Sequence, residues 1–149
     1  MSHKTLSSFS GELMRIMPQI IKGLFTRQMD ALRQGRITIP QFLSLDLIDT
    51  HGSLKMKEIA QELNITLPAA TGLINRLFKM GLVKRVPSEK DRRVIYITLT
   101  LKGKKLIEGI RLTRKKAFEE MFGKLTEREK MMYLSILRKV ADMVSGEKK

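Results

Sequence analysis

Apolar residues recur at helical spacing along most of the chain. The first such stretch runs from about Ser8 to Leu32, and its apolar side chains repeat at steps of three and four residues. This spacing predicts one long amphipathic helix, slightly strained at Pro18 and ended by Gly35. The apolar positions are Leu13, Ile16, Met17, Ile20, Ile21, Leu24 and Phe25.

Two shorter helices are predicted next. Thr38 and Gln41 have the spacing of a capping box, in which each side chain satisfies a backbone group at the start of a helix. The helix that begins there is expected to stop before His51. A third helix with apolar residues at positions 56, 59, 60 and 63 is broken by Asn64.

The segment 66–81 has the clearest helix ends. Thr66 is a good N-cap residue, Pro68 suits the first turn, and Gly81 ends the helix. At 100° per residue one stripe of this helix is apolar and the opposite face is short, polar and cationic. With the preceding helix it predicts a helix-turn-helix, whose second helix lies in the major groove of DNA. Taken alone, the polar face is equally well explained as a solvated surface. The apolar stripe consists of Ala70, Leu73, Ile74 and Leu77.

A two-stranded hairpin is predicted after this helix. Leu82–Val86 and Val94–Leu99 are rich in β-branched residues, and the loop 87–93 between them ends in Arg92 and Arg93. A helix-turn-helix followed by a hairpin is a winged helix, whose loop tip reaches toward the minor groove, where a guanidinium is favoured. Asp91 is expected to brace the loop by accepting hydrogen bonds. The alternative is a basic loop that is merely solvated.

The charge of the chain agrees with a nucleic-acid partner. The 149 residues include 29 Lys and Arg against 15 Asp and Glu, a formal net charge of +14. The excess is uneven, because residues 1–65 carry a net +2 and residues 66–149 a net +12. A charge of this size calls for an anionic partner, most often DNA or RNA. The functional surface is therefore expected in the second half.

Composition argues against an enzyme. There is no cysteine, so no disulfide or thiolate site can form, and His3 and His51 are the only histidines. No metal-binding or nucleophilic motif and no glycine-rich phosphate loop is present. Asp46 with Asp49, and the pair 119–120, are most simply solvated helix faces. No signal peptide or membrane span is expected, which favours a cytoplasmic protein.

The run from residue 63 to 106 resembles the winged-helix core of the MarR family of transcriptional regulators. The family pattern "rLekkGlv.R" matches residues 76–85, its "DxR" wing motif matches residues 91–93, and its "LTxxG" helix start matches residues 99–103. The order and spacing of the three motifs over about 50 residues carry the resemblance. It extends to the whole chain, because such proteins begin with a long helix and finish with two more.

The resemblance implies a mainly α (α+β) fold, with a winged helix-turn-helix core and N- and C-terminal dimerisation helices. Residues 1–149 would form a single domain, with the DNA-binding core at 36–100 and dimerisation helices at 1–35 and 101–149. Thr100 would cap a helix to about Phe122, and Thr126 would begin the last one. It implies a homodimer on a near-palindromic operator. Independently, apolar terminal helices have little of their own domain to pack against, so a partner subunit would cover them.

Eleven residues are candidates for DNA contact. By position, the resemblance makes Arg93 the minor-groove arginine, Asp91 its brace, and Thr71, Asn75 and Arg76 the recognition-helix candidates. Many relatives carry a larger side chain where this chain has Gly72, so either the backbone approaches DNA closely or fewer bases are contacted. Nearby lysines and Arg85 are expected to meet phosphates or raise the local potential. The full set is Pro68, Ala69, Thr71, Gly72, Asn75, Arg76, Lys79, Lys90, Asp91, Arg92 and Arg93.

The predicted partners are therefore double-stranded DNA, a second copy of the chain and a possible effector, with no cofactor and no membrane. The resemblance suggests an aromatic or phenolic anion as effector and repression as the default action. Arg15, Lys22 and His51 could offer charge to such an anion, although each is more often a solvated side chain. The rival hypothesis is a non-specific architectural nucleic-acid-binding protein, which the charge alone would also serve.

Overall fold

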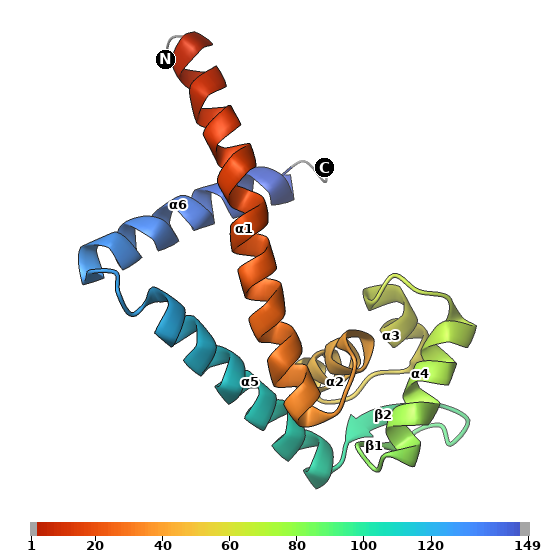
Figure 1. The fold of residues 1–149 in the computed structure, drawn as a ribbon. Coiled ribbons are helices and arrows are strands. Elements are labelled where there is room, and N and C mark those ends of the chain that lie inside the picture. Colours follow the sequence, from red (N-terminus) through yellow and green to blue (C-terminus); the bar gives the residue numbers. More distant parts are fainter. Residues whose placement is uncertain (1–2, 147–149) are drawn as a thin grey trace. The chain divides into compact units, whose positions relative to one another are not determined.

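The computed structural model describes residues 3–146, which form helices and one hairpin (Figure 1). The chain divides into two compact units, one ending at Arg114 and the other beginning at Lys115, so α5 contributes to both. The fold is mainly α with a small sheet, which confirms the predicted class. In chain order the elements are α1 (His3–Gly35), α2 (Ile39–His51), α3 (Met56–Glu62), α4 (Leu67–Lys79), β1 (Val83–Pro87), β2 (Ile95–Leu99), α5 (Leu101–Phe122) and α6 (Glu127–Gly146).

The helix ends largely follow the predicted signals. At the start of α2, the Oγ1 of Thr38 accepts a hydrogen bond from the Gln41 amide at 3.4 Å, and the Gln41 Oε1 accepts one from the Thr38 amide at 2.9 Å. The capping box is therefore confirmed. Differences are confined to boundaries: α1 begins at residue 3 rather than near Ser8, α2 includes His51, and each strand starts one residue later than predicted. Pro18 lies inside α1.

The core of the first unit joins α2, α3 and α4 to one face of the hairpin. The predicted apolar stripe of α4 is buried at Ala70, Ile74 and Leu77, whereas Leu73 is half-buried. β1 and β2 pair antiparallel, with Val83 opposite Leu99. Fully buried side chains that hold these elements together include Leu45, Ile48, Ile59, Ile74, Leu77, Leu82 and Ile97.

A short backbone bridge attaches the helix-turn-helix to the hairpin. The Leu54 amide donates to the Ile97 carbonyl oxygen at 3.1 Å, and the Ile97 amide donates back to Leu54 at 2.8 Å. Leu54 lies between α2 and α3. The segment that precedes the α3–α4 helix pair therefore pairs with β2 through one residue. The bridge was not predicted, because a single paired residue has no period in the sequence.

The end of α4 meets the start of α5 in a tight junction. Gly81 has φ +73°, a backbone conformation that side chains rarely adopt. The Thr100 hydroxyl donates to the Gly81 carbonyl oxygen at 2.6 Å and accepts from the Gly103 amide at 3.1 Å. A Cβ at Gly103 would overlap the Leu82 carbonyl oxygen. The "LTxxG" motif therefore has a packing reason, since only glycine lets α5 lie this close to residue 82.

An ion-pair cluster links α2 to α5. Arg111 donates to Asp46 at 2.7 Å and to Asp49 at 2.5 Å. The two carboxylates raise the pKa of Arg111 above its ordinary value, and the largest cause is the hydrogen bond that Arg111 donates to Asp46. The expectation that Asp46 and Asp49 form a merely solvated face is wrong, because both carboxylates pair with Arg111. The sequence did not reveal this pairing, since Arg111 is more than 60 residues away.

A second contact also joins α2 to α5. The Arg114 guanidinium lies 4.9 Å from the centre of the Phe42 ring.

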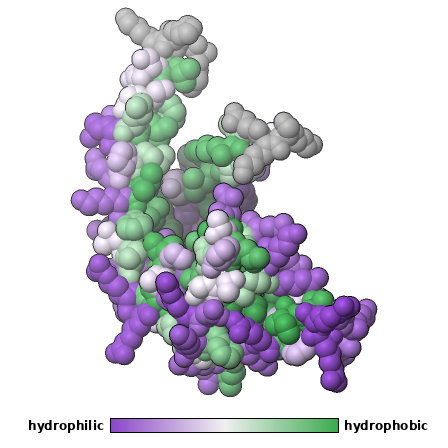
Figure 2. All heavy atoms as spheres, turned by 90° about the vertical axis from the view of Figure 1, so that its right-hand side faces the viewer, coloured by the Kyte–Doolittle hydropathy of each residue, from purple (hydrophilic) through white to green (hydrophobic). Residues whose placement is uncertain are grey.

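The N-terminal part of α1 leaves a large apolar face uncovered within its own unit. Most of its large apolar side chains are more than one-third exposed, including Phe9 at 61%, Met14 at 76% and Phe25 at 52%, whereas Leu24 is half-buried. Figure 2 shows this face as green patches along α1, the column on the left of the view. Only the last turns of α1 enter the core, through Ala31 and Leu32.

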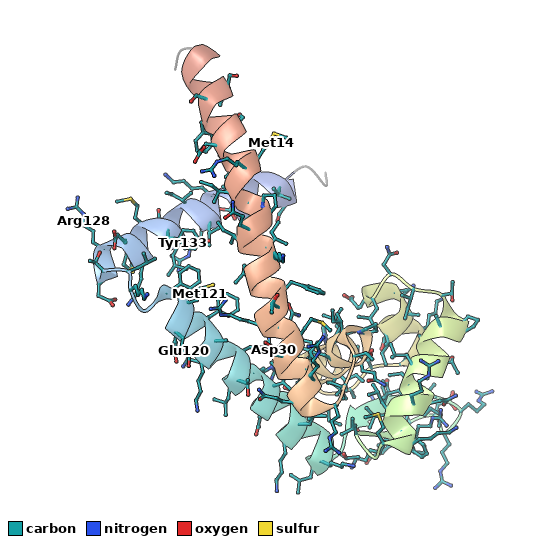
Figure 3. All side chains as sticks on the ribbon, in the orientation of Figure 1. Met14, Asp30, Glu120, Met121, Arg128 and Tyr133 are labelled. Atoms are coloured by element: carbon teal, nitrogen blue, oxygen red, sulfur yellow. The ribbon has the colours of Figure 1, made fainter. Side chains whose placement is uncertain are left out.

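The second unit consists of the end of α5 and α6. Phe118 and Phe122 stack at 6.2 Å between ring centres, and the ring centre of Tyr133 lies 5.5 Å from that of Phe122. Tyr133 belongs to α6 (Figure 3). These rings border an apolar recess of about 330 Å³. No described residue of α6 is buried, and its exposed apolar side chains include Met131, Met132, Leu134, Ile136, Leu137, Val140, Met143 and Val144.

No helix within residues 3–146 combines the length and apolar character needed to cross a lipid bilayer.

Candidate nucleic-acid interface

The start of α4 is held by its predicted cap. Thr66 has an extended backbone, and its Oγ1 accepts a hydrogen bond from the Ala69 amide at 3.3 Å. Pro68, in the first turn, has no amide to satisfy. Pro68 and Ala69 are both exposed. The first turn of α4 is therefore ordered by its own cap, and the surface of Pro68 and Ala69 is open to a partner.

The middle of α4 presents short side chains. The Thr71 hydroxyl donates to the Leu67 carbonyl oxygen at 2.8 Å, so its proton is used within the helix and its oxygen remains an acceptor. A Cβ built at Gly72 would meet nothing within 4 Å. Packing inside the protein therefore does not require a glycine at this position. Arg76 and Lys79, one and two turns further on, are exposed.

The C-terminal end of α4 is tied to α5 by a lysine. The Lys102 ammonium donates to the Met80 carbonyl oxygen at 2.7 Å, where the helix dipole favours positive charge. With Lys104 and Lys105, Lys102 is one of the nearby lysines that the sequence predicts to meet phosphates or raise the local potential. The structure gives Lys102 a different role, because its ammonium group already donates to a carbonyl oxygen at the end of α4.

Asn75 is half-buried and has a partner that the sequence did not reveal. The Nη2 of Arg85, on β1, donates a hydrogen bond to the Asn75 Oδ1. The same guanidinium lies over the ring of Phe78, with the Cζ 5.2 Å from the ring centre. Arg85 is thus held against α4, whereas the sequence predicted that it meets phosphates or raises the local potential. Contacts between a helix and a later strand depend on how the two elements pack, which no local pattern predicts.

The wing is braced by one carboxylate, as expected. Asp91 Oδ1 accepts hydrogen bonds from the Arg93 amide and from its Nε, both at 3.1 Å, and Oδ2 accepts one from Nη2 at 3.3 Å. The loop backbone is closed by bonds from the Val94 amide to the Asp91 carbonyl and from the Ser88 amide to the Val94 carbonyl. Despite its pairing, the Arg93 side chain is 91% exposed.

These contacts set the charge state of the wing. The side-chain hydrogen bonds from Arg93 lower the pKa of Asp91 below its usual range, and the Arg93 amide lowers it further. The carboxylate is therefore ionised at neutral pH and holds Arg93 at the loop end. Lys90 and Arg92 are exposed beside this pair. Lys90, Asp91, Arg92 and Arg93 thus form one protruding, mostly cationic surface.

Two of the three residues considered for an anionic effector already have partners. Arg15 pairs with Glu12 at 2.6 Å on the exposed surface of α1. The Nδ1 of His51 lies 3.0 Å from the Leu47 carbonyl oxygen. Lys22 is exposed on α1. The described residues do not gather these three side chains into one site.

A capped helix after a helix-turn connection, followed by a braced basic hairpin in the same compact unit, defines a winged helix-turn-helix DNA-binding protein. The model of the MarR family matches residues 37–95. The chain is 36% identical over 122 residues to the HTH-type transcriptional regulator FarR of Neisseria gonorrhoeae, which covers 80% of this chain and 81% of that protein. The chain belongs to the MarR family, and it is a DNA-binding transcriptional regulator.

Other relatives agree with this assignment. The HTH-type transcriptional repressor MdtR of Bacillus subtilis is 26% identical over 98% of this chain and 94% of its own length. The regulator YfiV of Bacillus subtilis is 42% identical, but over 50% of this chain and 46% of that protein. The solved structure of a MarR family protein from Bacillus stearothermophilus superposes with a TM-score of 0.82 at 26% identity, covering 97% of this chain and 99% of that one. These relatives are transcriptional regulators rather than enzymes.

Proposed function

We propose that this protein is a homodimeric repressor that binds a near-palindromic operator, with α4 of each subunit in a major groove and the wing in the adjacent minor groove. The DNA-binding core would be residues 36–100, and the helices at 1–35 and 101–149 would form the dimer. Because the partner is genomic DNA, we propose a cytoplasmic location.

The observation that carries the proposal is the pairing of two surfaces within one compact unit. The polar side of α4 is exposed at Pro68, Arg76 and Lys79, and the wing presents Arg93 almost fully exposed on a loop braced by Asp91. β1 follows α4 directly, so the distance between helix and wing is set by the fold. This is the arrangement needed to contact a major groove and its neighbouring minor groove at once.

Phosphate contacts would supply most of the affinity. Lys84, Lys90, Lys104 and Lys105 are exposed near the hairpin and the start of α5. Lysines that neutralise phosphates release counterions from the DNA, so the binding affinity falls steeply as the salt concentration rises. Such contacts do not distinguish one base sequence from another. Specificity is left to α4 and the wing arginine.

The dimer is supported by the apolar faces of the terminal helices. Exposed side chains on α1, such as Phe9 and Ile21, and on α6, such as Ile136 and Val144, are too many for a stable monomer surface in water. A second subunit would bury them. The operator would then carry two half-sites about one helical turn apart. Repression is supported by the likeness to a protein named a repressor.

The family resemblance also suggests an effector, a small aromatic or phenolic anion. Its mechanism would be to favour a dimer in which the two recognition helices no longer match the spacing of the half-sites. Ligand binding to that state would release the operator. The contacts of Arg15 and His51 described above do not add support for those residues as ligands.

A competition assay tests this proposal against the architectural alternative. A duplex isolated by repeated selection from a random pool is labelled, bound by the full-length protein at physiological salt, and competed with unlabelled random duplex. A specific regulator should bind its own site at least about a thousandfold more tightly than random DNA, and the selected sites should be approximately twofold symmetric. Equal competition by both duplexes would support a non-specific binder instead.

A further inference from the structure

The contact between Arg85 and Asn75 determines which chemical group of Asn75 can face DNA. Asn75 lies on the polar face of α4, and Arg85 comes from the strand that follows. Arg85 is held at two points on α4, by its hydrogen bond to the Asn75 Oδ1 and by the ring of Phe78, one turn further along. These two contacts hold the Arg85 guanidinium beside α4.

The orientation of the Asn75 amide follows from the chemistry of its partner. A guanidinium has only hydrogen-bond donors, so the amide must turn its oxygen toward Arg85. The Asn75 NH₂ group, which can only donate, is the part of the amide left without this partner. Because Arg85 never deprotonates in the physiological range, this orientation does not depend on pH.

This orientation matters for base recognition. An asparagine that reads adenine uses both ends of its amide, accepting from N6 and donating to N7, whereas guanine presents two acceptors, O6 and N7, in the major groove. We propose that Arg85 is a positioning residue that makes Asn75 a hydrogen-bond donor toward DNA, so that the base it meets is selected as guanine rather than adenine. The inference rests on the proposed function, because it requires α4 to lie in the major groove.

The test compares base preferences rather than affinities. Duplexes bound by the full-length protein are selected from a random pool and sequenced for the wild type and for Asn75→Ala, Arg85→Ala, Arg85→Lys and Lys84→Ala. The position at which Asn75→Ala loses preference marks the base that Asn75 reads. Lys84 is the matched control, since it is the exposed neighbour of Arg85 on β1, pairs opposite Thr98 and carries the same charge.

We expect guanine at the Asn75 position for the wild type. Arg85→Ala should raise the ratio of adenine to guanine there by at least about threefold, because the amide is freed to turn. Arg85→Lys, which can also only donate, should keep guanine. Lys84→Ala should weaken binding of all sequences alike and leave the preference unchanged. Urea unfolding of each variant confirms that it is folded.

Three results would overturn the inference while leaving the proposed function intact. The wild type could select adenine at the Asn75 position, or Asn75→Ala could change the base preference at no position. In the third, Arg85→Ala, like Lys84→Ala, would weaken binding of all sequences without changing the base preference. A wild-type protein that selects no sequence at all would instead refute the proposed function, and the inference with it. The two failures are therefore distinguishable within one experiment.

Discussion

Thr100 and Gly81 are joined by a hydrogen bond of 2.6 Å from the threonine hydroxyl to the glycine carbonyl, so the residue that caps α5 also closes the end of α4. The Lys102 contact to Met80 adds a second link at the same place. A helix proposed for the dimer is thereby fixed to the helix proposed to read DNA. A shift of α5 would be passed to α4 through these contacts.

Replacing Gly103 tests this junction. Gly103→Ala should destabilise the protein by about 1–3 kcal/mol, because its Cβ would collide with the Leu82 backbone and the packing could relax only by moving α5. Gly109→Ala is the control on the same helix, since a Cβ there meets nothing within 4 Å and helix propensity should raise stability by up to about 1 kcal/mol. Urea unfolding measures both. Equal effects of the two substitutions would contradict the close approach.

Gly72 lies on α4, the proposed recognition helix, without a packing reason of its own. Gly72→Ala should stabilise the free protein by about 0.5–1 kcal/mol through helix propensity alone. We expect the same variant to bind the operator about tenfold more weakly, because a Cβ at this position would obstruct a close approach of the α4 backbone to DNA. Thermal unfolding and a binding titration separate the two effects. Unchanged binding would mean instead that few bases are contacted at this position.

Arg93 is the most exposed member of the wing pair. Arg93→Ala should weaken operator binding by about 1–3 kcal/mol, or roughly 5- to 150-fold, while leaving the dimer intact. A gel-shift titration measures the first and analytical ultracentrifugation the second. Arg128→Ala, which removes an exposed arginine of α6, controls for the loss of one positive charge. If both variants bind alike, Arg93 contributes only to the general potential.

Much of the proposed DNA-binding surface could be predicted from the sequence, because its features depend on short segments of the chain. The ends of α4, the hairpin and the Asp91 brace depend on residues within a few positions of one another, so caps, glycines and alternation indicate them. The contacts of Asn75 with Arg85 and of Arg111 with Asp46 join residues from separate elements. Such pairs become visible only when packing has set the elements side by side. The sequence therefore described Asp46 and Asp49 as a solvated face, Asn75 as a candidate for DNA contact, and Arg85 as a residue that meets phosphates or raises the local potential.

The lowered pKa of Asp91 gives the wing a defined response to acid. A carboxyl whose pKa is depressed in the folded state stabilises that state above its unfolded pKa, and the contribution disappears as pH falls through the folded value. The brace should therefore persist at neutral pH and be lost only below the usual range of aspartate. Carbon-detected NMR titration should give a lower pKa for Asp91 in the wild type than in Arg93→Ala. Identical values would show that the pair does not form in solution.

The Arg111 cluster predicts that removing the arginine alone lowers the free energy of unfolding more than removing the arginine together with its two carboxylate partners. Arg111→Ala leaves Asp46 and Asp49 facing each other without a cation, and it should cost about 1–2 kcal/mol in the free energy of unfolding, a modest value because the groups are partly exposed. Adding Asp46→Asn and Asp49→Asn to that variant should recover part of the loss, because the carboxylate repulsion disappears. The coupling is obtained from urea unfolding of the wild type, the arginine variant, the double asparagine variant and the triple variant. Strictly additive effects would mean that Arg111 acts through its aliphatic chain alone, and the link from α2 to α5 would then be packing rather than charge.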